Sequence, residues 1–218
     1  MTLAAQAPLV APDDYFTIIG TAEQDYSPSS DGVVEYCLLD SLDRAVCAYG
    51  NLTSTLREHE KASERESISA DPSGWPANNG EVLIPARSDI DGSQPYSGWL
   101  WNRSHLVADS LGGDPTLENL VSGTRTQNVG STRTNGQYSG GMAYTELIAR
   151  DYLDTNNADS CPLYYAATPE YLGDELVPRS VTVDVLSCDG QINIRVEVYN
   201  TATGWNIDYY TAETTASQ

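Results

Sequence analysis

The chain has 218 residues, of which 40% are hydrophobic, and it carries 31 acidic and 11 basic side chains for a net charge of −20. This apolar content predicts a folded protein, and there is no run of 18 apolar residues that would predict a membrane-spanning helix. The negative charge speaks against a nucleic-acid partner at first sight, because phosphate binding is usually led by cations.

Short strands and one polar helix are predicted for the first third of the chain. Residues 15–20 and 33–39 have strand-forming sequences, separated by Asp-Gly and Pro/Ser clusters. Residues 45–52 either continue a hairpin or begin a helix. Residues 54–66 (STLREHEKASERE) are rich in helix formers and predict a surface helix. Two prolines and two glycines make residues 71–80 a loop.

The middle of the chain is expected to be mainly loops and helices. Residues 112–116 predict a turn, and residues 119–128 predict a short loop that leads into a helix. Residues 131–141 are rich in glycine and serine and are expected to be mobile. Residues 142–153 (MAYTELIARDYL) place apolar side chains at helical spacing, which predicts an amphipathic helix.

The last third of the chain changes to a period of two residues. Apolar residues alternate with polar ones in residues 181–185 and again in residues 192–198. Asp189-Gly190 between these runs is a strong hairpin signal. Residues 205–210 predict a final short strand.

The order of these elements predicts an α+β fold, because strands at both ends enclose helices in the middle. No internal repeat or long linker is present, so we expect a loose leader over residues 1–13 and a single domain over residues 14–218. The leader lacks the basic start and apolar middle of a signal peptide. Either the protein stays in the cytosol, or a signal peptide has been removed, which is the alternative we favour.

Four cysteines, at positions 37, 47, 161 and 188, allow three disulfide connectivities. Cys37 and Cys47 lie symmetrically about a predicted turn at residues 41–44, as cross-strand neighbours would. We therefore predict the disulfides Cys37–Cys47 and Cys161–Cys188, which indicate an oxidising compartment and a secreted protein. A structural zinc site is not expected, because no C-x-x-C pair and only two histidines occur.

The charge is distributed unevenly along the chain. Residues 100–150 contain four arginines (103, 125, 133 and 150) and four acids (109, 114, 118 and 146), so all the net negative charge lies outside this window. The acidic remainder is either a solubility device, suited to a saline habitat, or it leaves one less repulsive face for a polyanion. Neither interpretation identifies the chemistry.

Only two histidines are available as a general base. His59 lies in the charged helix and is expected to be solvated, whereas His105 lies among apolar residues in WLWNRSHLVADSLGG. A histidine in such a strand is by itself more often a core residue than a catalytic one. Asn119 follows His105 by 14 residues, Asn128 follows by nine more, and Glu146 comes after the Gly-rich segment. Each asparagine alone would indicate a cap or a turn.

Together, the segments NRSHLVADSLGG, ENLVSGTRTQN and GMAYTELIARDYL resemble the DNA/RNA non-specific endonucleases with a ββα-metal core, a family that includes secreted streptococcal DNases. The resemblance extends over residues 33–211. It implies a ββα-metal nuclease core at residues 99–153, with a central antiparallel sheet flanked by helices. The family signature Asp-Arg-Gly-His reads Asn102-Arg103-Ser104-His105 here. This change puts no carboxylate at position 102, and Ser104 indicates a backbone that does not need positive φ.

The resemblance also implies a role for each of these residues. His105 takes a proton from water, since an imidazole titrates near neutral pH. The amide oxygen of Asn128 binds one Mg²⁺, for which Mn²⁺ can substitute. Asn119 supports the site by holding His105 or a metal-bound water. Glu146 accepts hydrogen bonds from metal-bound water, or is simply an ion-pair partner of Arg150.

The arginines are the candidate contacts to the substrate. The resemblance implies that Arg103 contacts phosphate or the transition state, with a structural ion pair as the alternative. Arg125 and Arg133 are candidate phosphate contacts, with a solvated surface as the alternative, and Arg150 is a further candidate contact to the substrate. Nothing resembles a recognition helix, an RRM or a zinc finger. We therefore expect DNA and RNA to be bound through phosphate and sugar, with little sequence preference and 5′-phosphate products.

Three other interpretations remain open. The chain could be a catalytically inactive binding member of the family, or a nuclease toxin domain with a cognate inhibitor protein. A hydrolase with a serine or cysteine nucleophile is less favoured, because no G-x-S-x-G occurs and the cysteines are expected to be paired. An N-x-S sequon at Asn102 lies inside the proposed site, where a glycan would block it, and this favours a bacterial source.

Overall fold

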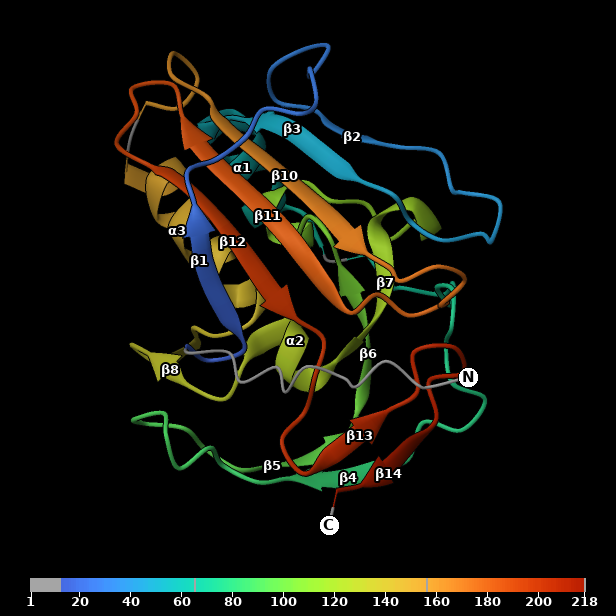
Figure 1. The fold of residues 1–218 in the computed structure, drawn as a ribbon. Helices are drawn as coiled ribbons and strands as arrows, with labels where there is room; N and C mark the ends of the chain where they lie inside the picture. Colours follow the sequence, from blue (N-terminus) through green and yellow to red (C-terminus); the bar gives the residue numbers. More distant parts are fainter. Residues whose placement is uncertain (1–12, 65, 156, 218) are drawn as a thin grey trace.

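The computed structural model describes residues 13–64, 66–155 and 157–217, so the predicted leader lies, except for its last residue, outside the described residues. A large antiparallel sheet is backed by helices, and smaller hairpins lie at one end of the molecule (Figure 1). This arrangement confirms the α+β prediction. Within the described ranges, no helix is long and apolar enough to cross a membrane.

Six strands form the large sheet in the order β1-β12-β11-β10-β3-β2, and all neighbouring pairs are antiparallel. In that order the strands cover Phe16–Gly20, Asn193–Tyr199, Ser180–Ser187, Leu163–Glu170, Ala48–Leu52 and Val34–Tyr36. Strand β10 is not apparent from a period of two, because apolar and polar residues do not alternate in its sequence, LYYAATPE.

The alternating apolar residues of β11 and β12 contribute to the core between this sheet and α3 (Met142–Thr155). The fully buried valines of these strands are Val181, Val183, Val185, Val196 and Val198. Full burial of a valine side chain stabilises a fold by roughly 1.5–3 kcal/mol. The two strands are joined by the predicted turn, in which Gly190 adopts a φ of +73°. Apolar alternation thus fixes which face of the sheet receives α3.

Helix α1 (Ser54–Ala62) is the predicted surface helix, but it ends before residue 66. Thr53 caps its N-terminus by accepting a hydrogen bond from the backbone N–H of Leu56. At the other end, the N–H and the hydroxyl of Ser63 both donate to the carbonyl of His59. These bonds give the carbonyl of His59 its hydrogen-bond partners at the end of the helix. No residue of the helix is buried, so packing does not favour a longer helix.

The disulfide Cys37–Cys47 lies at the end of the β2–β3 hairpin. The hairpin alternative for residues 45–52 is therefore correct. The strand predicted over residues 33–39 was too long, because regular pairing of β2 covers only three residues. Beyond it, the carboxylate of Asp40 accepts hydrogen bonds from backbone N–H groups of the following turn.

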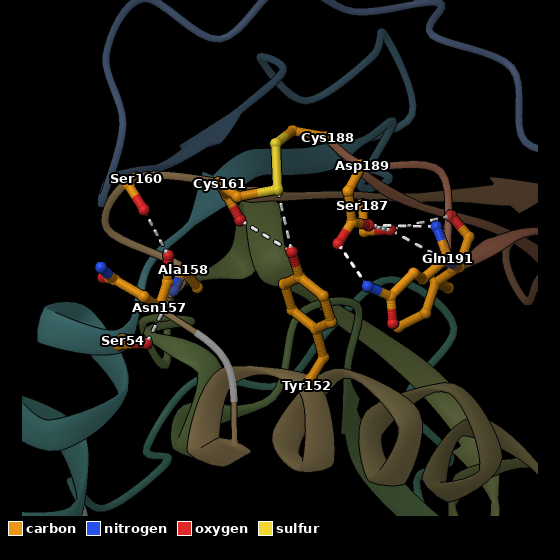
Figure 2. The surroundings of a disulfide bond; sticks show 11 residues. Ser54, Tyr152, Asn157, Ala158, Ser160, Cys161, Ser187, Cys188, Asp189 and Gln191 are labelled. Carbon is orange, nitrogen blue, oxygen red and sulfur yellow. Dashed lines mark hydrogen bonds between the residues drawn. A yellow bond between two sulfur atoms is a disulfide. The ribbon is translucent and has the colours of Figure 1, made fainter.

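The second predicted disulfide, Cys161–Cys188, joins the start of β10 to the turn between β11 and β12 (Figure 2). The hydroxyl of Tyr152, near the end of α3, donates to the carbonyl of Cys161 at 3.0 Å and lies 3.1 Å from its Sγ. On the other side of the turn, the hydroxyl of Ser187 donates to the carboxylate of Asp189 at 2.6 Å. The disulfide thus joins β10 to β11, and the hydrogen bond of Tyr152 ties the end of α3 to the same point.

A second apolar cluster lies among the hairpins at the bottom of Figure 1. There β4 (Glu81–Ile84) pairs with β5 (Tyr96–Trp99), and β13 (Trp205–Ile207) pairs with β14 (Thr214–Ala216). The buried members of the cluster are Ile84, Leu100, Trp101, Val177, Ala202, Ile207, Tyr209 and Ala212. The strand predicted over residues 205–210 is shorter in the structure, because the chain turns where Ala212 donates to the carbonyl of Asp208.

A hairpin and a short helix lie between the large sheet and this second cluster. The hairpin is formed by β6 (Trp101–His105) and β7 (Leu120–Thr124), and the helix is α2 (Arg125–Val129). The loop that joins β6 to β7 contains two 3-10 turns, η1 (Asp109–Leu111) and η2 (Leu117–Asn119). The helix predicted after the loop is present, but the loop prediction for residues 119–128 was wrong, because β7 occupies half of that range. All five residues of β7 (LVSGT) are buried, and no polar alternation marks the strand.

The segment after α2 is a small hairpin, β8 (Arg133–Thr134) with β9 (Gln137–Tyr138), in place of the mobile segment predicted over residues 131–141. The buried carboxylate of Asp14 holds its base. It accepts hydrogen bonds from the backbone N–H and the hydroxyl of both Ser131 and Thr132, at 2.6–2.8 Å. A contact across more than a hundred residues thus orders a stretch whose composition suggests flexibility.

Candidate active site

The hairpin β6–β7 positions His105 at the end of its first strand. His105 pairs with Leu120, and the N–H of Leu106 donates to the carbonyl of Asn119, which continues the pairing by one residue. The side chain of His105 is largely buried, with 8% of the residue exposed. Helix α2 begins directly after β7, where the hydroxyl of Thr124 caps it by accepting from the N–H of Gln127.

Asn128 is brought to the same hairpin by α2. Its Oδ1 accepts a hydrogen bond from the hydroxyl of Ser104, the residue before His105, at 3.2 Å. The close approach of α2 requires a glycine on β7. A Cβ at Gly123 would lie 2.2 Å from the Oε1 of Gln127 and 2.7 Å from the Cβ of Ser104. The structure therefore brings the predicted metal ligand next to the strand that carries the predicted base.

Asn119 holds the loop that follows His105. The residue is fully buried, and its Oδ1 accepts from the N–H of Val107 at 2.9 Å. Its Nδ2 donates to the carbonyls of Val107 at 3.0 Å and of Asp114 at 2.8 Å. The loop is tight at this point, since a Cβ at Gly113 would lie 1.8 Å from the carbonyl oxygen of Val107. The geometry of Asn119 suits positioning of the backbone beside His105.

Glu146 and Arg150 face the same loop from α3. They form an ion pair at 3.3 Å with both side chains mostly buried, and the guanidinium of Arg150 also contacts the hydroxyl of Ser110 at 3.4 Å. Burial, reinforced by the nearby carboxylate of Glu146, raises the pKa of the Tyr165 hydroxyl, which therefore stays protonated. Through the contact of Arg150 with Ser110, the Glu146–Arg150 ion pair connects α3 to η1, which lies a few residues after His105.

Arg103 is engaged in an ion pair that the sequence could not specify. Its Nε lies 2.8 Å from the carboxylate of Asp71, and its guanidinium lies over the ring of Trp75 at 4.4 Å from the ring centroid. Asp71 is more than half exposed, so water and salt screen the pair. The structural ion pair expected as the alternative role of Arg103 is thus present, and no sequence pattern marks Asp71 or Trp75 as its neighbours.

Arg125 and Arg133 share a single aromatic neighbour. The guanidinium of Arg133 lies 4.0 Å from the ring centroid of Tyr138, and that of Arg125 lies 4.4 Å from the same ring and 4.9 Å from that of Tyr96. Among the described residues, these two arginines are the cations with no carboxylate partner within ion-pair distance. They therefore give the surface beside α2 a local positive charge.

Two further polar residues lie where α2 meets the hairpin. The Nδ2 of Asn102 and both amide atoms of Gln127 are buried without a hydrogen-bond partner. Neither side chain was singled out as functional from the sequence. Asn102 stands out in the sequence as the replacement of the signature aspartate and as part of a sequon, and no sequence pattern marks Gln127. His59, the other histidine, is on the surface of α1 with 74% of its side chain exposed.

The donor set of this site suits a hard cation bound mainly by water. Among the described residues, no group of three or more His, Cys, Asp and Glu side chains is arranged to hold a metal ion. Asn128 offers an amide oxygen with two acceptor positions, of which Ser104 uses one. Mg²⁺ prefers oxygen ligands and usually keeps several waters, so one amide oxygen fits its requirements.

Comparison with known proteins identifies the family of this arrangement. A sequence profile of the DNA/RNA non-specific endonucleases matches residues 24–188, which include the β6–β7–α2 unit and α3. The chain belongs to the DNA/RNA non-specific endonuclease family.

Three known proteins resemble the chain over most of its length. A deoxyribonuclease of Streptococcus dysgalactiae subsp. equisimilis is 36% identical over 213 residues, covering 87% of this chain but only 62% of that relative. The structure of Sda1 nuclease with a bound zinc ion has a TM-score of 0.81 and 31% identity, covering 94% of this chain and 97% of that one. NucA from Streptococcus agalactiae with a bound magnesium ion has a TM-score of 0.68 and 21% identity, covering 92% and 88%, and supports the fold alone.

Proposed function

We propose that this chain is a metal-dependent endonuclease that hydrolyses phosphodiester bonds of DNA and RNA with little sequence preference and leaves 5′-phosphates. Mg²⁺ is its proposed ion, with Mn²⁺ able to substitute. Beyond family membership, one observation carries the proposal: the amide oxygen of Asn128 lies 3.2 Å from the hydroxyl of the residue before His105. An imidazole base and a hard oxygen ligand therefore sit on adjacent elements of one ββα unit.

In this proposal the chain supplies the base and the ligand. His105 accepts a proton from the attacking water, a task suited to a group that titrates near neutral pH. Asn128 would hold the ion through Oδ1, since an amide oxygen suits a hard cation that keeps several waters. When bound, a divalent ion stabilises charge on the phosphate and on the leaving 3′ oxygen. Asn119 keeps the loop after His105 in place through its three backbone hydrogen bonds.

The remaining charged residues are assigned to the substrate or to metal-bound water. Glu146 accepts hydrogen bonds from water around the ion, and Arg150 keeps that carboxylate oriented through their ion pair. Arg125 and Arg133 bind phosphates of the substrate strand, which is supported by their lack of a carboxylate partner among the described residues. Arg103 contacts the phosphate only after exchanging its exposed ion pair with Asp71.

We also propose that the protein is secreted and that residues 14–218 form one domain. The two disulfides support an oxidising compartment. The buried side chain of Asn200 supports one domain, because it links the β6–β7 hairpin to the residues just before β11 in the large sheet. It accepts from the N–H of Thr124 and donates to the carbonyls of Ser122 and Pro178, at 2.8–2.9 Å.

Digestion of plasmid DNA and of RNA, with and without Mg²⁺, tests the proposed activity. His105→Ala should lower cleavage by at least about a hundredfold, the lower end of the usual contribution of a general base. EDTA should abolish cleavage by the parent, and Mg²⁺ or Mn²⁺ should restore it. His59→Ala is the matched control, because it removes the other histidine from an exposed position and should leave cleavage unchanged.

The alternatives give different results in the same assay. Robust cleavage by His105→Ala would remove this residue as the base. A parent protein that binds DNA but cuts neither substrate in Mg²⁺ would be the inactive binding member of the family. A toxin domain would cleave as proposed, and would be recognised by a tight inhibitor protein from the same source.

A further inference from the structure

Ser104 replaces the glycine of the family signature, and its side chain has a defined contact. The residue is fully buried at the penultimate position of β6, and its hydroxyl donates to the Oδ1 of Asn128 at 3.2 Å. It does not adopt a positive φ, so the backbone here accepts a side chain without strain. A glycine at this position could not make the contact.

The hydrogen bond from Ser104 restrains the Oδ1 atom of Asn128, which is the atom proposed to bind the cation. The last torsion of an asparagine side chain is broad, so an amide on a helix surface samples several orientations. A hydrogen bond to Oδ1 restricts that rotation and leaves the second acceptor position of the oxygen open. Groups that orient a metal ligand in this way typically change metal affinity or activity by about 10- to 100-fold when removed.

The Cβ of Ser104 packs against Gly123 of β7. It lies 2.7 Å from the position that a Cβ on Gly123 would take, so the serine fills the space left by the glycine where α2 crosses the hairpin. Replacement by alanine would keep the Cβ and the packing and remove only the hydrogen-bond donor.

We propose that the hydroxyl of Ser104 is a positioning group for the metal ligand, holding the carbonyl oxygen of Asn128 ready for a divalent cation. The inference rests on the proposed role of Asn128 in metal binding. It assigns to Ser104 no contact with the substrate, so its effect falls on metal affinity and not on the chemical step at saturating metal.

Direct titration with Mn²⁺, followed by its electron paramagnetic resonance signal in the absence of nucleic acid, tests this inference on the full chain. Ser104→Ala should weaken Mn²⁺ binding by about tenfold or more, and saturating metal should restore the parent rate of plasmid cleavage. Ser104→Thr keeps the hydroxyl and should retain most of the affinity. Unchanged Mn²⁺ affinity in Ser104→Ala would overturn the inference, as would equal losses in the alanine and threonine variants.

Ser122→Ala is the matched control for the removal of a buried hydroxyl from this hairpin. Ser122 is fully buried on β7, and its hydroxyl donates to the carbonyl of Ser73, away from Asn128. This variant should bind Mn²⁺ like the parent, whatever its thermal stability. An equal loss of Mn²⁺ affinity in both variants would show a general loosening of the hairpin and would contradict a specific role for Ser104.

Asn128→Ala separates failure of this inference from failure of the proposed function. If Asn128→Ala loses Mn²⁺ binding while Ser104→Ala retains it, only the role of Ser104 is refuted. If Asn128→Ala itself binds Mn²⁺ like the parent, the proposed ligand is wrong and the inference falls with it. If the inference is right, adding Ser104→Ala to Asn128→Ala should cause no further loss of binding.

Discussion

Asn119 makes three hydrogen bonds, all to backbone groups of the loop after His105. Asn119→Ala would leave one N–H and two carbonyl oxygens without these partners. Each buried group left unsatisfied costs about 1–3 kcal/mol, so the variant should lose roughly 3 kcal/mol or more of unfolding free energy. Urea denaturation followed by tryptophan fluorescence would measure this loss.

The same variant should lose cleavage activity even where it is still folded, because the loop beside His105 is no longer fixed. Asn206→Ala provides the control, since Asn206 is exposed on β13 and should tolerate the change within about 0.5 kcal/mol. Equal stabilities for parent and Asn119→Ala would mean that the loop is held by other contacts.

Single residues also show what the sequence could and could not reveal about the site. His105, Asn119 and Asn128 are predicted as site residues from the ordered motifs, and the structure gathers them around one hairpin. The partner of Arg103 was not found, because Asp71 lies 32 residues away in a loop. Sequence spacing indicates neighbours on one helix or one strand, but it does not show which distant carboxylate a guanidinium meets.

At the level of elements, the two disulfides constrain loops of different length. Cys161–Cys188 closes a separation of 27 residues and Cys37–Cys47 one of 10. Loop-closure entropy predicts a loss of about 3.6 kcal/mol for the first and about 2.7 kcal/mol for the second. Replacing Cys161 and Cys188 by alanine should therefore destabilise the protein more than replacing the other pair, as measured by urea unfolding under non-reducing conditions.

The position of Cys161–Cys188 adds to this difference, because Tyr152 of α3 donates to the carbonyl of Cys161. Loss of the disulfide should loosen the end of α3, the helix that carries Glu146 and Arg150. Cleavage activity should therefore fall more in this double variant than in the one lacking Cys37–Cys47. A larger loss of stability in the Cys37–Cys47 variant would contradict the loop-length argument.

Elements whose apolar and polar residues recur with a regular period were predicted, and buried elements without such a period were not. Strands β11 and β12 and helix α3 show their apolar periodicity in the sequence. Strand β7 lies in the interior with every residue buried, and no polar alternation marks it. The β8–β9 hairpin is ordered by Asp14, more than a hundred residues earlier in the chain. Local composition contains no trace of such a contact.

The whole molecule carries a net charge of −20, which opposes its own compact state. Salt screens this repulsion, since the Debye length falls from about 30 Å at 0.01 M to about 10 Å at 0.1 M. We therefore expect the melting temperature to rise by a few degrees between these NaCl concentrations, measured by calorimetry at neutral pH. A melting temperature that falls with added NaCl would mean that the ion pairs outweigh the repulsion.

Salt should have the opposite effect on nucleic-acid binding, but a small one. Each phosphate neutralised by a cation contributes about −0.9 to the slope of log K against log salt for duplex DNA. Most cations of the described residues are already paired with carboxylates, and Arg125 and Arg133 are the exceptions. A duplex should therefore bind with a slope of about −2 to −4, well below that of a protein that makes six or more phosphate contacts.

Fluorescence anisotropy with a labelled duplex in EDTA would measure this slope without cleavage. Replacing Arg125 and Arg133 together by glutamine should reduce its magnitude by about two, one phosphate contact for each arginine. Arg195→Gln is the control, because Arg195 is held by the carboxylates of Glu23 and Asp184 on the large sheet and should not contribute. A slope steeper than about −5 would show that ion pairs such as Arg103–Asp71 open on binding. Arginines that are paired with carboxylates in the free protein would then also bind phosphates, in spite of the negative charge of the molecule.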